Sequence, residues 1–468
     1  NGFDIPAVQR YHVEKKLTSK CHILGEEDTG GKMSREDNMG HQINLQLAAE
    51  ISFLPVAVQW AETAAKVFGL GREDALKICL ATEEIFSYLS SRVCPGEVLD
   101  MRCVNGIFYV RVEFRFPVSV LNMGALNVAA AVACDSEESL SEMGLALATR
   151  TVDRLNISAE RKNYICLSIE KDKEYPYVAA TSSLPVSVRG KLAVTAPDAE
   201  GIKSYIARVA RTPDERLPSF FRYPGKVADM VAGGEYQALT AVDTRGECAG
   251  GLIFHFRTPQ VVEMFGPQVF VPEREDETAA MLFEVCLART ARTKAIGILN
   301  LTGVPNSLKT QFEFLGSLTN KVQGDRKVVH PCHYRLLHED PGAVVFTDAA
   351  LTDYLQREYS RIFLARELRE VTDQGETRTG ASIFATEFHR EGSRAILRPL
   401  WPGVDFDANV QRHLRFLQEE GIDNIFFTID LGISWQASLM TVLMNNDFHP
   451  ALILPFAGQS DLLYFQYD

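Results

Sequence analysis

The sequence has no paired cysteines, no long apolar run and no secretory start. Its nine cysteines are scattered singly, without a Cys-x-x-Cys pair, which is typical of a reduced intracellular protein rather than a disulfide framework. The most apolar stretch, residues 125–134, is about half as long as a membrane-spanning helix requires and contains Asn127. The first residues lack the basic and apolar regions of a signal peptide. We therefore expect a cytoplasmic protein without a membrane partner.

Positive charge is scarce relative to negative charge. The 48 Lys and Arg residues face 61 Asp and Glu residues, so the net charge is 48 − 61 = −13. An acidic surface repels phosphate backbones, which argues against a nucleic-acid partner. The 468 residues are 46% hydrophobic. At about 150 residues per domain, they are enough for about three domains, each with a buried core.

Common catalytic and metal signatures are also missing. The sequence has no Gly-x-Ser-x-Gly, Gly-x-Gly-x-x-Gly or His-Glu-x-x-His motif. Residues 25–34 resemble a phosphate loop only superficially, because the spacing is wrong and three acids lie where phosphates would bind. Residues 330–338 contain three histidines and one cysteine, but at no established ligand spacing. We therefore predict no metal site.

Hydrophobic periodicity divides the chain into an arm and three units. Residues 1–40 are polar and aperiodic, and we interpret them as an irregular N-terminal arm. Residues 41–175 alternate strand and helix patterns, with a hairpin signal at Asn105-Gly106 and a helix expected over 138–155. The predicted element order is β-α-α-β-β-loop-α-β-β, an α/β sandwich.

Residues 188–335 and 342–468 repeat one order: strand, helix, antiparallel strands, helix, strand, helix, strands. Helical material is expected over 306–315 in the first copy and 349–369 in the second. The best local match sets residues 294–301 against 423–430, each between two amphipathic helices. This order predicts a tandem duplication. The fold class is therefore α/β (α+β): one sandwich followed by two mixed-sheet domains.

The segment Leu80-Ala-Thr-Glu-Glu-Ile-Phe-Ser-Tyr-Leu-Ser-Ser-Arg92 resembles the first ATP-binding box of the histidine-kinase-like ATPase superfamily, of the anti-sigma-factor serine kinase type. The resemblance covers about residues 42–172 and implies a Bergerat-type sandwich. It also implies that Glu84 is the candidate catalytic base. Tyr88 stands where the family has an Asn that holds Mg²⁺, and Arg92 replaces the usual His.

Other positions depart from this family. The phenol of Tyr88 is a poor ligand for a hard cation such as Mg²⁺. Residues 107–123 contain no Asp-x-Gly-x-Gly box, and of the later signature only Gly144-Leu145 remains. Two interpretations stay open: a degenerate nucleotide site, or residual ATP or ADP binding through Glu84, Tyr88, Gly144 and Leu145. Between these elements, the apolar lid at 121–137 is expected to form an ordered plug over the nucleotide pocket, or else an oligomer contact.

The two repeated units resemble the GCN5-related acyltransferase (GNAT) superfamily by element order. That family binds the acyl-CoA diphosphate at the start of its central helix, through Arg/Gln-x-x-Gly-x-Gly/Ala. In the first copy, residues 269–278 contain no glycine and four acids. In the second copy, residues 398–407 keep Arg398 and Gly403 but add prolines and aspartates. Acyl-CoA is therefore a candidate cofactor, chiefly of the second copy.

The resemblance also assigns roles in the second copy. The strand 427–430, which ends at Asp430, would pair with the pantetheine arm, and Ser434 would lie near the cofactor. Tyr464 or Tyr467 would protonate the departing thiolate. The alternative is that both tyrosines pack in an alternating strand.

Two functions follow from these observations. The first is a regulatory or scaffold protein with a degenerate anti-sigma-kinase-like module, which binds a protein partner of the sigma-factor regulatory type, and tandem GNAT-like domains that bind a small molecule or mediate association. The second is an acyl-CoA-dependent N-acyltransferase regulated by its N-terminal domain.

Overall fold

The computed structural model describes residues 42–92, 97–117, 127, 129, 148, 150–160, 164–181, 187–212, 214, 216–322, 326–371, 378, 380–389 and 392–468. The chain forms two compact units. Unit 1 comprises residues 1–121 and 147–173, and unit 2 comprises residues 122–146 and 174–468. The predicted α/β (α+β) class is confirmed, since both units combine β-sheets with helices. The predicted arm of residues 1–40 lies outside the described residues.

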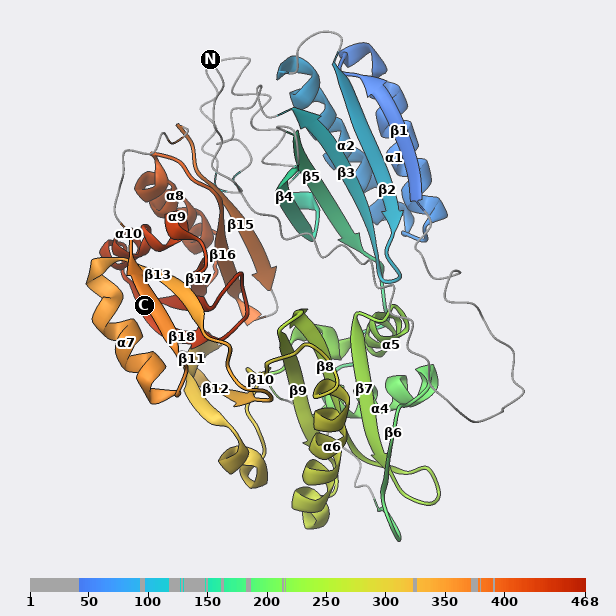
Figure 1. Cartoon of the computed structure of the whole chain (residues 1–468). Helices are drawn as coiled ribbons and strands as arrows, with labels where there is room; N and C mark the ends of the chain where they lie inside the picture. Colours follow the sequence, from blue (N-terminus) through green and yellow to red (C-terminus); the bar gives the residue numbers. More distant parts are fainter. Residues whose placement is uncertain are drawn as a thin grey trace. The chain divides into compact units, whose positions relative to one another are not determined.

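In the described part of unit 1, an antiparallel sheet has the strand order β1-β2-β3-β5-β4. Its strands are β1 (Gln42–Ala48), β2 (Val98–Asn105), β3 (Tyr109–Pro117), β4 (Arg154–Glu160) and β5 (Tyr164–Asp172). Helices α1 (Leu54–Val67) and α2 (Arg72–Arg92) lie side by side across one face of this sheet (Figure 1).

Local sequence explains most of these elements. Pro55 lies in the first turn of α1, where its missing N–H costs nothing. The predicted hairpin at Asn105-Gly106 is confirmed, since β2 ends at Asn105 and pairs with β3. The helix predicted over 138–155 is only partly described: residues 148 and 150–151 are helical. Its predicted end is wrong, because Leu155 already pairs with Ile169 in the sheet.

The first sheet of unit 2 has the order β11-β12-β10-β9-β8-β7-β6 among the described strands. The strands are β6 (Ala193–Thr195), β7 (Tyr236–Val242), β8 (Cys248–Thr258), β9 (Val261–Val269), β10 (Gly297–Asn300), β11 (Glu313–Val322) and β12 (Arg326–Leu336). Helices α4 (Ala199–Arg211), α5 (Pro224–Ala232) and α6 (Glu275–Thr290) complete this copy. The helix predicted over 306–315 is wrong in its second half, because a short 3₁₀ helix ends at Gln311 and β11 begins at Glu313.

The second sheet of unit 2 has the order β15-β16-β17-β19-β18 in the part of the chain that is described. Its strands are β15 (Ile383–His389), β16 (Arg394–Trp401), β17 (Asn424–Asp430), β18 (Phe448–Leu454) and β19 (Leu462–Tyr467). The helices are α7 (Thr352–Arg361), α8 (Phe406–Glu419), α9 (Ser434–Ala437) and α10 (Met440–Asn445). Strands β13 (Ala343–Thr347) and β14 (Arg366–Glu370) form a separate parallel pair.

The prediction of helical material over 349–369 is therefore wrong at its end. Helix α7 stops at Arg361, Phe363 takes a positive φ of 57°, and the chain turns into β14. Ladder hydrogen bonds to β13 outweigh the local helical pattern here.

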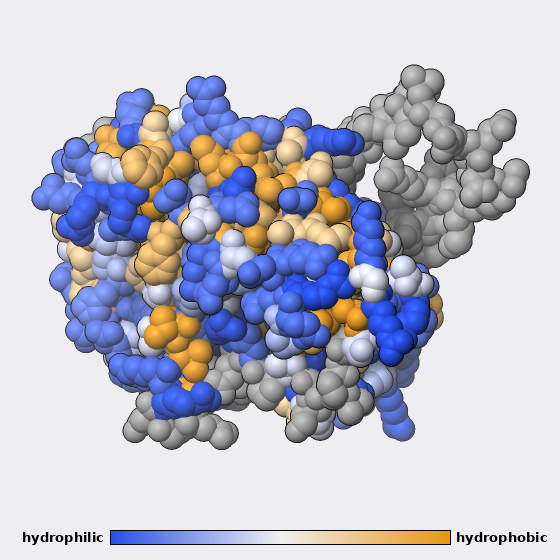
Figure 2. All heavy atoms as spheres, turned by 90° about the horizontal axis from the view of Figure 1, so that it is seen from below, coloured by the Kyte–Doolittle hydropathy of each residue, from blue (hydrophilic) through white to orange (hydrophobic). Residues whose placement is uncertain are grey.

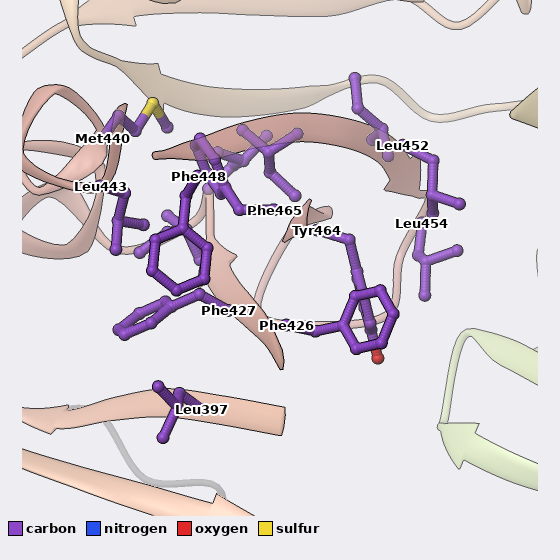
Figure 3. Packing of buried hydrophobic residues seen from close by; sticks show 14 of the residues in the cluster. Leu397, Phe426, Phe427, Met440, Leu443, Phe448, Leu452, Leu454, Tyr464 and Phe465 are labelled. Atoms are coloured by element: carbon purple, nitrogen blue, oxygen red, sulfur yellow. The ribbon is translucent and has the colours of Figure 1, made fainter. Parts of the chain in front are cut away.

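Buried side chains of β16–β19 and α10 form the core of the second copy (Figure 3). Phe427 and Phe448 meet edge to face, with ring centroids 5.9 Å apart. The strands that the sequence match aligned, β10 and β17, hold the same place in the two sheets. Each is parallel to the strand before it and antiparallel to the last strand of its copy. None of the described helices is long and apolar enough to cross a membrane.

Candidate functional site

Each copy contains a pair of parallel strands that separate along their length. In the second copy, β16 and β17 pair only over 394–397 and 424–427. In the first copy, β9 and β10 pair only over 261–263 and 297–299. Beyond these residues the strands diverge, and α8 or α6 begins just after the end of β16 or β9. This is the place at which the GNAT resemblance predicts the acyl-CoA site.

In the second copy, the side chain of Gln436 spans the diverging strands. Its Oε1 accepts the N–H of Asp430 on β17 at 2.9 Å, and its Nε2 donates to the carbonyl of Pro399 on β16 at 3.2 Å. Gln436 is buried, so these bonds form away from water. The backbone N–H of Asp430, which we expected to lie on a strand facing a pantetheine arm, is therefore satisfied by the protein itself.

The carboxylate of Asp430 holds a loop together. It accepts the backbone N–H of Gly432 at 2.9 Å and that of Gln459 at 2.7 Å. A Cβ on Gly458 would lie 2.5 Å from Asp430 Oδ2, so the loop packs tightly on this carboxylate. Ser434 is half-buried at the start of α9. The carboxylate of Asp430 thus holds the local loop structure.

The start of α8 is covered by backbone of the same copy. A Cβ on Gly403 would lie 2.1 Å from the amide nitrogen of Ser382, which is closer than any real side chain allows. Asp405 accepts the N–H of Ser382 at 2.6 Å and forms an ion pair with Arg412 at 2.7 Å. Arg398 is exposed on β16.

A diphosphate does not fit this helix start. Anion binding requires free N–H groups and favours the absence of acids. Here the backbone of residues 381–382 packs against Gly403, and the carboxylates of Asp405 and Asp407 lie at the N-cap and in the first turn.

The first copy has one hydrogen bond across its separated strands and an acidic helix start. Buried Asn300, at the end of β10, donates to the carbonyl of Gly266 on β9 at 2.8 Å and accepts the N–H of Thr302 at 3.0 Å. The first turn of α6 carries Glu275, Asp276 and Glu277. These acids stabilise the positive end of the helix and would repel a phosphate. Coenzyme A does not fit here either.

Tyr464 belongs to a polar chain that joins the two copies. Its hydroxyl accepts a hydrogen bond from Arg257 Nη2 at 3.2 Å, and Arg257 Nη1 lies 2.9 Å from Glu263. His255 Nε2 lies 3.4 Å from the same carboxylate. Burial alone would raise the pKa of Glu263, but Arg257 and His255 outweigh it and lower the pKa to about 2. Tyr467 accepts a hydrogen bond from Gln418 instead, at 3.2 Å.

The sequence analysis did not predict this polar network. A usable signal was present, because His255 and Arg257 interrupt the apolar run of β8, and Glu263 stands among the buried residues of β9. A charged residue within a buried strand requires a partner of opposite charge, but the sequence does not say which one.

In unit 1, the candidate nucleotide residues of α2 are Glu84 and Tyr88. Glu84 is half-buried, and its pKa is raised by burial and by the neighbouring Glu83. Tyr88 lies in the core, with 1% of its surface exposed, so its phenol is not presented to solvent. Gly144 and Leu145 lie outside the described residues, as does most of the predicted lid at 121–137. The two described lid residues, Asn127 and Ala129, are buried and belong to unit 2 rather than to a plug within unit 1.

No family model matches the chain, and no curated protein is similar to it. Among solved structures, it is similar to a GNAT superfamily phosphinothricin acetyltransferase from Sinorhizobium meliloti in complex with acetyl-CoA. That match has 17% identity and a TM-score of 0.27, and it covers 32% of this chain and 90% of the other.

Two further matches are of the same kind. A GNAT family N-acetyltransferase from Escherichia coli in complex with CoA has 16% identity and a TM-score of 0.24, with 40% and 93% covered. The aminoglycoside 6′-N-acetyltransferase from Enterococcus faecium has 12% identity and a TM-score of 0.24, with 32% and 99% covered. Matches with so low an identity and TM-score do not indicate that this chain shares the activities of the three enzymes.

Proposed function

We propose that this chain is a regulatory or scaffold protein whose tandem GNAT-like domains act by binding a ligand or partner rather than by acyl transfer. The observation that carries the proposal is the Gln436 side chain, which spans the separated strands of the second copy by bonding to both Asp430 and Pro399. In the first copy, Asn300 of β10 makes one hydrogen bond across to the carbonyl of Gly266 on β9.

Binding of acyl-CoA in the second copy would cost free energy. A pantetheine arm entering the second copy would displace Gln436 and leave its buried amide without partners. Each buried polar group left unpaired costs about 1–3 kcal/mol. The diphosphate would in addition face Asp405 and Asp407 at a helix start that the chain already covers. These opposing terms favour a domain that keeps the GNAT framework without its cofactor.

Unit 1 supplies the second part of the proposal. We interpret it as a degenerate anti-sigma-kinase-like module that binds a protein partner of the sigma-factor regulatory type. Core placement of Tyr88 removes the side chain at the metal-ligand position from a nucleotide. Figure 2 shows, on the face seen from below in Figure 1, apolar side chains interspersed with hydrophilic ones.

The proposal is tested by titrating the full chain with acetyl-CoA and with Mg-ATP in a calorimeter, and by mass spectrometry of an amine panel incubated with acetyl-CoA. We expect no saturable binding below millimolar concentration and no acylated product. Micromolar binding together with turnover would overturn it. Gln436→Ala is expected to stay inactive as well, because the start of α8 remains covered in this variant.

The alternative is an acyl-CoA-dependent N-acyltransferase regulated by unit 1. Exposed Arg398, at the position where the GNAT loop begins, favours it. If the amine panel yields an acylated product, Arg398→Ala separates the two functions. Loss of product in Arg398→Ala, with Arg415→Ala unaffected as an exposed control on α8, assigns the activity to the second copy.

A further inference from the structure

Strand β1 forms one edge of the unit 1 sheet. It pairs with β2 along its whole length and with no other strand in the described part of the chain. Its seven residues include no charged residue, no proline and no glycine. By contrast, β4 at the opposite edge carries Arg154 and Glu160. Charged residues and proline protect edge strands from pairing with another strand, and β1 has neither.

A backbone hydrogen bond next to β1 fixes the direction of its N–H groups. The N–H of Ala49, the residue after β1, donates to the carbonyl of Glu97 at 2.9 Å, in the register of the β1–β2 ladder. Hydrogen-bonded pairs alternate along an antiparallel ladder, so the odd-numbered residues of β1 bond to β2. The even-numbered residues direct their backbone groups to the outer edge, where their N–H groups have no acceptor among the described residues.

The side chains of β1 are sorted by face. On the face where the neighbouring side chains of β2 are buried, three apolar side chains are only half-buried: Ile43, Leu45 and Leu47. On the other face, three exposed side chains are amides: Gln42, Asn44 and Gln46. The pattern is therefore nearly the same in both directions from Leu45, which is the condition for a strand to pair antiparallel with a copy of itself.

A second copy of β1 fits this edge. The register that pairs all seven residues places Leu45 on a two-fold axis, so that Asn44 faces Gln46 of the partner subunit. The hydrogen-bonded pairs of this register fall on even-numbered residues, whose backbone groups are the ones that point outward. Apolar side chains meet apolar ones, amides meet amides, and no like charges oppose each other.

Exposed apolar side chains surround the carboxyl end of β1. Val98, which lies opposite Ala48, is 47% exposed, and Ile51 and Phe53, which follow β1, are 59% and 37% exposed. In an antiparallel pair, this end of β1 lies beside the start of the partner's strand. Large apolar side chains beside an uncharged edge favour a protein partner over solvent.

We propose that the chain self-associates through β1, whose two copies pair antiparallel about Leu45 and join the unit 1 sheets of both subunits into one continuous sheet. The same surface serves both subunits, as in most two-fold dimers. The inference involves neither nucleotide nor acyl-CoA, so it stands or falls separately from the proposed function.

Sedimentation equilibrium of the full chain tests the proposal. We expect a dimer of twice the chain mass of 52.1 kDa at micromolar concentration. Asn44→Pro removes an outward N–H that the β1–β2 ladder does not use, a position at which an edge strand tolerates proline. The dissociation constant should rise about tenfold or more, with an unchanged circular dichroism spectrum. Asn44→Ala keeps the N–H and is the matched control, which should dimerise like the native chain.

A second pair of variants tests the register. Asn44→Lys combined with Gln46→Lys places like charges opposite each other across the two-fold axis, whereas Asn44→Glu combined with Gln46→Lys places opposite charges there. The dissociation constant of the first variant should exceed that of the second by about tenfold or more. Both positions are exposed, so this pair tests the proposal even if Asn44→Pro does not fold.

Two results would overturn the proposal. A native chain that stays monomeric into the high micromolar range would show that β1 does not pair with itself. A dimer that is equally stable in Asn44→Pro and Asn44→Ala, or that ignores the sign of the charge at position 44, would place the interface on another surface.

Discussion

Asn424 of the second copy forms a two-point pair with the backbone of Lys321 in the first copy. Its Oδ1 accepts the Lys321 N–H at 2.6 Å and its Nδ2 donates to the Lys321 carbonyl at 2.8 Å. Two residues earlier on β11, Gln466 makes the same pair with Thr319, at 3.1 and 2.7 Å. Side-chain amides thus take the place of a neighbouring strand along β11. Two side-chain amides of the second copy therefore satisfy backbone groups at this edge of the first copy.

Asn424→Ala is expected to lower the free energy of unfolding of the second copy by about 2 kcal/mol, because both Lys321 groups lose a buried partner. Urea unfolding followed by tryptophan fluorescence measures this change, since Trp401 and Trp435 lie in this copy. Asn445→Ala, at an exposed position on α10, should change stability by less than about 0.5 kcal/mol. Equal effects of the two variants would contradict the role of the pair.

The free energy of unfolding should decrease as the pH falls, because His413 and His330 are buried. Burial lowers the pKa of His413 from 6.5 to about 4, helped by Arg412 against the opposing bond to the Asn409 carbonyl and the charge of Asp405. Burial and Arg394 likewise lower the pKa of His330 to about 4, with Arg216 adding to this and Asp214 opposing it. Between pH 4 and 6.5 the unfolded chain binds more protons, so the free energy of unfolding rises with pH across this window and is level for these groups above it.

His413→Leu should therefore flatten the dependence between pH 6.5 and pH 4, by at most about 3 kcal/mol for one histidine. Urea unfolding at pH 4.5 and pH 7.5 gives the comparison. His449→Leu, whose imidazole is 62% exposed beside Asp468, serves as the control. A native-like pH dependence in His413→Leu would show that this histidine is not kept neutral by folding.

Glu263 should matter more to stability than Tyr464, although both contact Arg257. Glu263→Gln removes the only carboxylate within 4 Å of this guanidinium among the described residues and should cost about 2–3 kcal/mol. The cost stays moderate because 26% of the Arg257 side chain is exposed. Tyr464→Phe removes one hydrogen bond and should cost about 1 kcal/mol. Calorimetric melting of both variants checks this order, and a larger loss for Tyr464→Phe would refute it.

Gly403, which precedes α8, and Gly380, which precedes β15, provide a matched pair of alanine substitutions. Gly403→Ala would place a Cβ 2.1 Å from Ser382 N, whereas a Cβ at Gly380 meets nothing within 4 Å. We expect Gly403→Ala to lower the free energy of unfolding by about 3 kcal/mol and Gly380→Ala to be nearly neutral. Thermal unfolding of the two variants measures this difference. A neutral Gly403→Ala would mean that the backbone of residues 381–382 moves away from Gly403 at little cost.

Local pattern was sufficient for much of the fold. Alternation of apolar residues predicted β1, Asn105-Gly106 predicted the hairpin of β2 and β3, and the match of residues 294–301 with 423–430 placed β10 and β17 correctly. These features depend on residues near one another in the chain, whose period and turn chemistry are read directly. The acids at the start of α6 were likewise visible in the sequence, because the charge of a residue type is known without the fold.

Tertiary structure alone decided what fills the separated strands and the sheet edges. Gln436 reaches back from α9 to Pro399, and Asn127 meets Ser382, which lies 255 positions further along. An amide side chain has the same donor and acceptor wherever it lies, so its sequence context does not reveal its partner. Parallel pairing of β14 with β13 was also hidden, since a ladder partner overrides local helical preference. Composition and periodicity thus determined the elements, while long-range hydrogen bonds determined which side chains fill the space between the separated strands.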